Sequence, residues 1–148
     1  MSREEIVPFA TTLLVRDSCL CLHAQRAARS LARRFDEAFR HLGLTNGQFS
    51  LLMSLNRPEP PPMGPVASLL AMDRTTLTAA LKPLQRRGLV EILPDPNDRR
   101  GKRIKLTPEG MALLVQAAPI WVSTSKDVEA LLPEGDPERL RRNLLSLS

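Results

Sequence analysis

The chain has 148 residues, of which 43% are hydrophobic, and this is enough for one domain with a core of its own. Its two cysteines provide neither a disulfide framework nor a metal cluster. No apolar run approaches the roughly 20 residues of a membrane span, and residues 1–17 lack the pattern of a secretory signal. A cytoplasmic protein is therefore expected, and the net charge of +5 suits an anionic partner.

A long amphipathic helix is predicted first, from residue 20 to residue 42, because its apolar residues recur at intervals of three and four. Gly43 is placed to end this helix. Its other side carries four arginines, Arg26, Arg29, Arg33 and Arg40. We interpret them as the ordinary charged face of an amphipathic helix rather than as a second DNA-binding surface.

Two shorter helices follow. Thr45 and Gln48 match a capping box that opens a helix reaching about residue 55. Four prolines within residues 57–62 interrupt it. Pro65 suits the first turn of the next helix, which ends near Ala71.

A fourth helix is predicted from Arg74 to Arg87, with Asp73 as its N-cap and Gly88 beyond its end. Its leucines recur with helical spacing and face inward, so small polar and basic side chains share the solvent side. Two short helices joined by a turn of about three residues are typical of a helix-turn-helix.

Two runs rich in Val, Ile and Leu, residues 89–93 and 103–106, predict a β-hairpin after this helix. Residues 94–102 between them combine turn formers with basic side chains, and we predict that they form a basic loop. A hairpin directly after a recognition helix is a wing. Residues 74–105 contain nine basic and three acidic residues, a net charge of +6, which is expected of a localised nucleic-acid footprint.

Another helix is predicted after the hairpin, with Thr107 as its N-cap, Pro108 as its first residue and Pro119 as the site of a kink. Asp136 restarts a last helix, which carries a stripe of leucines. The outer helices are amphipathic and flank the central module, as the base of a dimer requires.

Four segments in this order resemble the multiple-antibiotic-resistance-regulator (MarR) family: residues 73–78, 85–90, 95–100 and 106–110. The most specific is the Asp-Arg-Arg run that precedes Leu-Thr-Pro-Glu-Gly at this distance. The resemblance implies a homodimer whose first helix and last two helices form a helical base. It also implies a ligand pocket between base and module, whose occupancy changes the spacing of the two recognition helices.

The expected fold is mainly α with a small β-hairpin, one MarR-like domain over residues 1–148. A winged helix-turn-helix module is expected at residues 44–110, with dimerisation helices at 1–43 and 111–148. The chain departs from the family at Lys82-Pro83, where the family usually has Asp-Arg. Proline there removes one helical hydrogen bond and should bend the second half of the recognition helix.

A two-fold dimer places its recognition helices in successive major grooves of double-stranded DNA, about 34 Å apart, so a palindromic operator is expected. The candidates for base contacts are Arg74, Thr75, Thr76 and Thr78. Arginine reads guanine, and threonine reads a base or a thymine methyl group. Lys82 is expected to meet phosphate, and Arg86 is a further candidate for such a contact. Simple capping and surface filling is the alternative explanation of the threonines.

By the same resemblance, Arg100 at the wing tip enters the minor groove, whose negative potential attracts arginine. Arg99 and Lys102 add backbone contacts, and Asp98 orients a neighbouring arginine because DNA repels a carboxylate. A solvated charged loop without DNA contact is the alternative.

Cys21 lies near the start of the first helix, about where hydroperoxide-sensing family members carry a reactive cysteine. The tyrosines that those members use are absent, and Phe35 and Asn46 occupy the comparable places. Cys19 is a poor disulfide partner, because residues i and i+2 of a helix point to different faces. A free cysteine is most often a small buried hydrophobe, which is the alternative.

A small-molecule pocket is considered last, lined by Phe35, Phe39, Phe49, Met53 and Trp121, although such apolar stripes are first expected in the core. The predicted function is sequence-specific binding of double-stranded DNA by a transcriptional repressor that a ligand releases. Oxidant sensing through Cys21 is the alternative. A winged helix that only contacts proteins leaves the +6 segment unexplained. No catalytic set, cofactor motif or zinc spacing predicts an enzyme.

Overall fold

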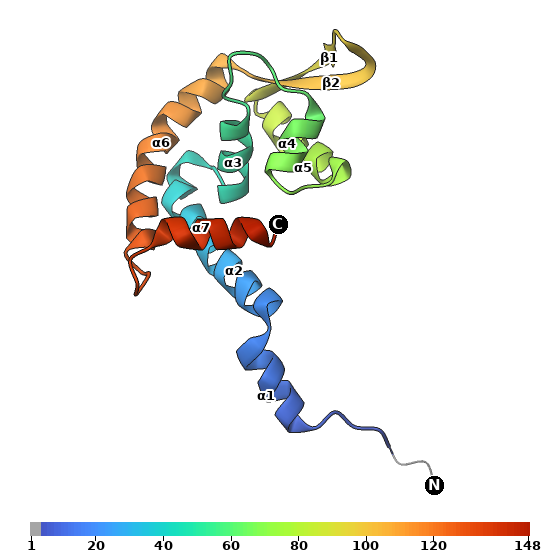
Figure 1. The fold of residues 1–148 in the computed structure, drawn as a ribbon. Helices are drawn as coiled ribbons and strands as arrows, with labels where there is room; N and C mark the ends of the chain where they lie inside the picture. The colour runs from blue at the N-terminus through green and yellow to red at the C-terminus, as the bar shows by residue number, and fades with distance from the viewer. Residues whose placement is uncertain (1–3) are drawn as a thin grey trace.

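The computed structural model describes residues 4–148. These residues form seven α-helices, one short 3-10 helix and one two-stranded antiparallel sheet (Figure 1). In chain order the elements are α1 (Phe9–Ser18), α2 (Leu20–Phe39), η1 (Arg40–Leu42), α3 (Asn46–Ser54), α4 (Met63–Leu69), α5 (Arg74–Arg86), β1 (Val90–Asp95), β2 (Asp98–Leu106), α6 (Pro108–Glu129) and α7 (Pro137–Ser146). The predicted class, mainly helical with a small hairpin, is confirmed. No helix within residues 4–148 has the length and apolar character to cross a membrane.

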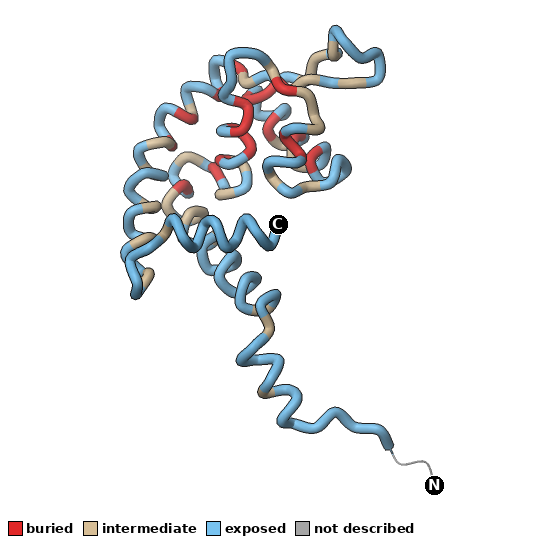
Figure 2. The backbone as a smooth tube through the Cα atoms, viewed as in Figure 1, coloured by how far each residue is buried: buried red, intermediate tan, exposed pale blue. Residues whose placement is uncertain are grey.

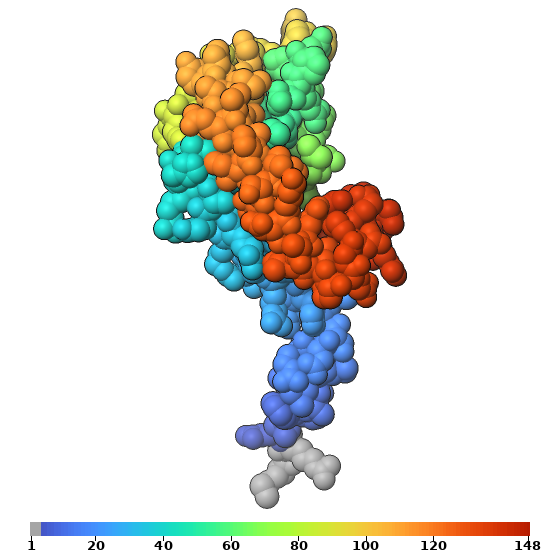
Figure 3. All heavy atoms as spheres, turned by 90° about the vertical axis from the view of Figure 1, so that its left-hand side faces the viewer, coloured from blue at the N-terminus to red at the C-terminus, as the bar shows by residue number. Residues whose placement is uncertain are grey.

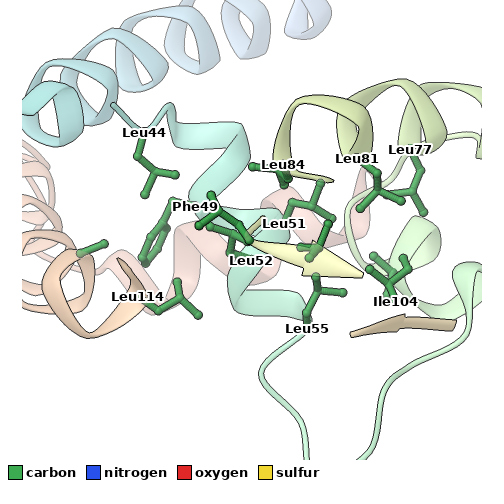
Figure 4. Packing of buried hydrophobic residues seen from close by; sticks show 14 of the residues in the cluster. Leu44, Phe49, Leu51, Leu52, Leu55, Leu77, Leu81, Leu84, Ile104 and Leu114 are labelled. Carbon is green, nitrogen blue, oxygen red and sulfur yellow. The ribbon is translucent and has the colours of Figure 1, made fainter. Parts of the chain in front are cut away.

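The core lies in the middle of the chain, where α3, α4, α5 and the hairpin pack together (Figure 2). Leu77, Leu81 and Leu84 of α5 are fully buried, as their spacing predicts, and they face the leucines of α3 (Figure 4). Ile104 of β2 and Leu114 of α6 complete this cluster. Burial of these side chains holds the helix-turn-helix and the hairpin as one module.

The helix starts follow from side-chain caps. Thr45 and Gln48 form the predicted capping box, with both hydrogen bonds present. Asp73 and Thr107 cap α5 and α6 through the backbone N–H groups three residues on. Gly43 adopts a left-handed conformation with φ of 62° and ends the α2–η1 unit. These predictions are confirmed because each cap needs only residues that are close in sequence.

The predicted nine-residue wing loop is wrong. β1 extends to Asp95 and β2 starts at Asp98, so only two residues form the turn. Pro94 pairs with Lys102 and Asp95 with Asp98, which leaves residues 99–101 as a bulge on β2. The two aspartates make this possible, because their side chains accept hydrogen bonds from backbone N–H groups of the turn and the bulge.

The proline-rich segment contacts the other side of β2. The backbone N–H of Ile104 donates to the carbonyl of Pro61 at 3.0 Å, and Pro62 bridges to Arg103. Arg103 also donates to the carbonyl of Pro60 at 3.3 Å and to the Asp95 carboxylate at 3.1 Å. The segment therefore interrupts the helices, as predicted, and in addition fixes the wing to the module.

Residues 1–43 were assigned to dimerisation helices, but a separate helix before residue 20, α1, was not predicted from the sequence. It begins after Pro8, whose side chain makes no capping hydrogen bond, and it contains no buried residue. The extended backbone of Cys19 separates it from α2. Figure 3 shows α1 extending away from the body of the molecule and α7 projecting to one side. Helices α2 and α6 lie side by side.

Candidate nucleic-acid interface

The first turn of α5 presents the candidate base-contacting side chains to solvent. Arg74, Thr75, Thr76 and Thr78 are all exposed. Asp73 accepts the backbone N–H of Thr76 at 2.7 Å. This hydrogen bond lowers the pKa of Asp73, so the cap stays ionised.

The hydroxyl proton of Thr78 is already engaged in a hydrogen bond. Its hydroxyl donates to the carbonyl of Arg74 at 2.8 Å, four residues earlier in the helix. The side chain is exposed and its oxygen can still accept, so it is suited to accept from an amino group or to touch a thymine methyl. Lys82 is exposed one turn further along α5.

The wing carries Arg99, Arg100 and Lys102 on its exposed surface. Asp98 accepts the backbone N–H of Arg100 at 3.0 Å, so the carboxylate orients the backbone of this arginine rather than its guanidinium. A side chain at Gly101 would crowd the same carboxylate, because an added Cβ would lie 3.1 Å from its Oδ2 atom. The bulge therefore holds Arg100 through the backbone and leaves its guanidinium free of ion pairs within residues 4–148.

The start of α5 and the wing border one cleft of about 340 Å³. Arg74 and Thr78 line it from the helix, and Arg100 and Lys102 line it from β2. Of the nine predicted DNA-contacting residues, these four converge. The other five are exposed but do not line the cleft, Thr75, Thr76, Lys82, Arg86 and Arg99.

No individual role was predicted for Arg103, although its charge contributes to the basic segment. Its ion pair with Asp95 is the most buried in the described part of the chain, with 20% and 10% of the two side chains exposed. The hydrogen bond from the Asn97 backbone is the main cause of a lowered pKa of Asp95, and Arg103 contributes as well. The alternation of side chains along β2 could have indicated where Arg103 points. Because the next residue, Ile104, is buried, Arg103 lies on the opposite face of the strand.

Both cysteines are free. Cys19 is the N-cap of α2, and its sulfur accepts the backbone N–H of Leu22 at 3.4 Å. Cys21 is exposed and its sulfur accepts from the Gln25 amide at 2.9 Å. Since Cys19 has extended backbone, the two thiols do not share one helix, and the helical argument against pairing them does not hold.

Four of the five predicted pocket residues, including Trp121, line a cavity of about 180 Å³ between α2, α3 and α6. Phe39 and Phe49 are buried and stack with ring centroids 4.8 Å apart, while Phe35 is half-buried. Met53 does not line this cavity and is 40% exposed. The remaining lining residues are Ala28, Leu31, Ala32, Asn46 and Ser50.

A helix-turn-helix followed by a two-stranded hairpin that shares a basic cleft with the second helix defines a winged helix-turn-helix protein. The sequence profile of the MarR family matches residues 44–102. The structure is similar to the crystal structure of the M. tuberculosis transcriptional regulator MosR in complex with DNA. The TM-score is 0.80 and the identity 38%, over 88% of this chain and 93% of MosR. The chain belongs to the MarR family of transcriptional regulators.

Other relatives agree. The HTH-type transcriptional regulator PecS of Dickeya dadantii is 29% identical over 78% of this chain and 72% of PecS. MarR of Escherichia coli is 36% identical over 57% of this chain and 58% of MarR, so that alignment spans little more than half of either protein. A crystal structure of an E. coli MarR mutant with operator DNA has a TM-score of 0.80 at 26% identity, over 91% of this chain and 97% of that one.

Proposed function

We propose that this chain is a repressor that binds a palindromic operator as a homodimer, with α5 in the major groove and the wing in the adjacent minor groove. The observation that carries the proposal is the shared cleft, in which Arg74 of α5 and Arg100 of the wing face one volume. Cationic side chains from two elements that converge on one surface are suited to two neighbouring grooves of a duplex. Since the operator lies on the chromosome, we place this activity in the cytoplasm of a bacterium.

Within this interface each residue has its own task. We assign base contacts to Arg74, Thr75, Thr76 and Thr78, and phosphate contacts to Lys82, Arg99 and Lys102. Arg100 enters the minor groove. Two wing carboxylates, Asp95 and Asp98, also line the cleft; Asp95 is paired with Arg103, and each accepts a backbone N–H group.

Dimerisation is supported by the distribution of exposed apolar side chains. Helices α1 and α7 contain no buried residue, yet both carry large hydrophobic side chains. Those that are at least two-fifths exposed on the terminal helices include Phe9, Leu14, Val15, Leu140, Leu144 and Leu145. A second copy that covers them would form the helical base of the dimer, since exposed apolar patches of this kind mark association sites.

The cavity between α2, α3 and α6 supports regulation by a small molecule. It is lined by aromatic rings together with polar residues, and it lies between the base helices and the module. Asn46 provides a polar group at its edge. We assign the effector to this cavity, with Phe35, Phe39 and Phe49 as contacts. Met53 lies outside its lining.

The experiment begins with a duplex that the wild-type protein selects from a randomised pool. Its affinity is then measured by fluorescence anisotropy across a salt series. A dimer that contacts phosphates through several cations should bind with a Kd of about 10⁻⁸ M or tighter, and log affinity should fall steeply with log salt. A flat salt dependence, or selection that yields no common sequence, would contradict the proposal and favour a protein-contacting module.

Oxidant sensing is the second candidate, favoured by the exposure of Cys21 and by the position of Cys19 at a helix N-terminus. An organic hydroperoxide would convert the Cys21 thiolate to a sulfenic acid and leave as the alcohol. Operator affinity is measured before and after peroxide, in wild type and in Cys21→Ser. Unchanged affinity of the oxidised wild type removes this candidate.

A further inference from the structure

Arg87 joins the recognition helix to the helical base. It is the C-cap of α5, and its guanidinium extends to the connection between α2 and α3. Nη1 donates to the carbonyl of Gly43 at 2.7 Å, and Nη2 donates to the carbonyl of Leu42 at 3.3 Å. Within residues 4–148, no other side-chain hydrogen bond links α5 or its C-cap to α2 or η1. The rest of α5 packs chiefly against α4 and β1, which belong to the same module.

The two acceptors are the last carbonyls of the α2–η1 unit. Carbonyls at a helix C-terminus lack helical partners and carry partial negative charge, so a guanidinium is well suited to bind them. Gly43 has a left-handed backbone, and a Cβ added there would lie 3.6 Å from Nη2 of Arg87. The planar guanidinium therefore lies close against this turn and contacts both carbonyls at once.

The same connection borders the aromatic cavity. Phe39, three residues before Leu42, ends α2 and lines the cavity. Asn46 lines it from the other side, and both its backbone N–H and its amide donate to the Asp36 carboxylate, at 2.7 and 2.8 Å. The connection formed by residues 40–45 is therefore held in two ways. Asn46 ties its end to Asp36 of α2, and Arg87 ties its middle to the end of α5. A change in the cavity that moves Phe39 reaches α5 through this connection.

We propose that Arg87 is a positioning residue that couples the cavity to the recognition helix, and this rests on the proposed role of α5 in DNA binding. Coupling between two sites is reciprocal, so operator binding at α5 must change the surroundings of the cavity. Trp121 reports this change, because it is the single tryptophan of the chain and it lines the cavity. It lies on α6, away from the α5–wing cleft.

The test measures operator affinity and Trp121 emission in four full-length proteins: wild type, Arg87→Ala, Arg87→Lys and Arg86→Ala. The DNA is the duplex selected by wild type. Arg86→Ala removes the same charge one residue earlier, where the side chain forms no hydrogen bond with any of residues 4–148. Loss of phosphate attraction alone therefore appears in both alanine variants, whereas loss of coupling appears only at Arg87.

We expect wild type and Arg86→Ala to change their Trp121 emission when the duplex saturates them. Arg87→Ala should bind about five-fold more weakly than Arg86→Ala, at the lower end of typical coupling, and should show no emission change at saturation. Arg87→Lys should keep part of the change, because an ammonium reaches one carbonyl but not both. If Arg87→Ala does not fold, as judged by circular dichroism, the partial response of Arg87→Lys is the deciding measurement.

Two outcomes would overturn the coupling and leave the proposed DNA binding intact. One is an equal emission change in wild type and in both Arg87 variants. The other is a saturated wild type whose emission does not change. A wild type that selects no duplex overturns the proposed function itself, and the role of Arg87 with it.

Discussion

The hydroxyl oxygen of Thr107 lies 2.6 Å from the carbonyl oxygen of Gly88, to which it donates a hydrogen bond. The same oxygen accepts the backbone N–H of Gly110 at 3.0 Å, and the backbone N–H of Thr107 donates to Leu89 at 3.1 Å. One buried side chain therefore joins the end of the recognition helix to the first turn of α6. This explains in physical terms why Leu-Thr-Pro-Glu-Gly follows the wing.

Gly110→Ala should destabilise the protein. An added Cβ would overlap the carbonyl oxygen of Leu89 and lie 2.7 Å from Cδ1 of Leu106, and the backbone cannot move aside without breaking the Thr107 contacts. We expect a loss of at least about 1–3 kcal/mol in the free energy of unfolding, measured by urea denaturation. Gly47→Ala is the control, because nothing lies within 4 Å of its Cβ, and it should stabilise by roughly 0.5 kcal/mol. Equal stability of the two variants would argue against the close packing at Leu89.

Arg100→Ala should weaken operator binding about tenfold or more and leave the dimer intact. The guanidinium is exposed and makes no ion pair within the described residues, so its removal costs little stability. The slope of log affinity against log salt should also become shallower by about one per site. Arg139→Ala on α7 removes the same charge far from the wing and should bind normally. Unchanged affinity in Arg100→Ala would mean that the wing does not reach DNA.

Acid should weaken the link between α2 and α3. The backbone N–H of Asn46, followed by its amide, lowers the pKa of Asp36 below its ordinary value of 3.8. The stabilisation is therefore complete above pH 3.8 and is lost as the pH falls through the pKa of the folded state. Asp36→Asn should be less stable than wild type at neutral pH, and the gap should narrow in acid. Urea denaturation along a pH series checks this.

The neighbouring Glu37→Gln provides the comparison for that series. Glu37 forms an exposed ion pair with Arg40 on the surface of the helix, and such pairs contribute little. Its stability difference from wild type should stay small at every pH. A pH dependence in Glu37→Gln as steep as that in Asp36→Asn would show that general surface charge, rather than the Asn46 contacts, governs the effect.

Leu144→Glu should convert the dimer to a monomer while each chain stays folded. Leu144 is 47% exposed in the single chain, so the charge disturbs no core, but it would be buried without a partner in the dimer base. Sedimentation velocity gives the mass, and circular dichroism gives the helix content. Leu69→Glu on α4 changes another exposed leucine, 62% exposed, outside the terminal helices and should remain a dimer. Dimerisation of both variants would place the interface elsewhere.

Much of the architecture was determined by the sequence itself, because the relevant interactions are local. Caps such as Thr45, Asp73 and Thr107 need only an N–H group three residues away, and the buried leucines of α5 need only helical spacing. The family motifs located the wing because they too are short runs of neighbouring residues. Helix α1 was missed because no side chain caps it and no core residue marks it.

The tertiary structure alone decided which side chains meet. The cleft joins Arg74 to Arg100 across 26 positions of sequence, and Arg87 reaches a carbonyl 44 residues earlier. The short wing turn also depends on such contacts, because Arg103 holds β2 against Asp95 and the proline segment. Periodicity carries no information about pairs this far apart. Burial of the shared core brings them together, and the site exists only once that core has formed.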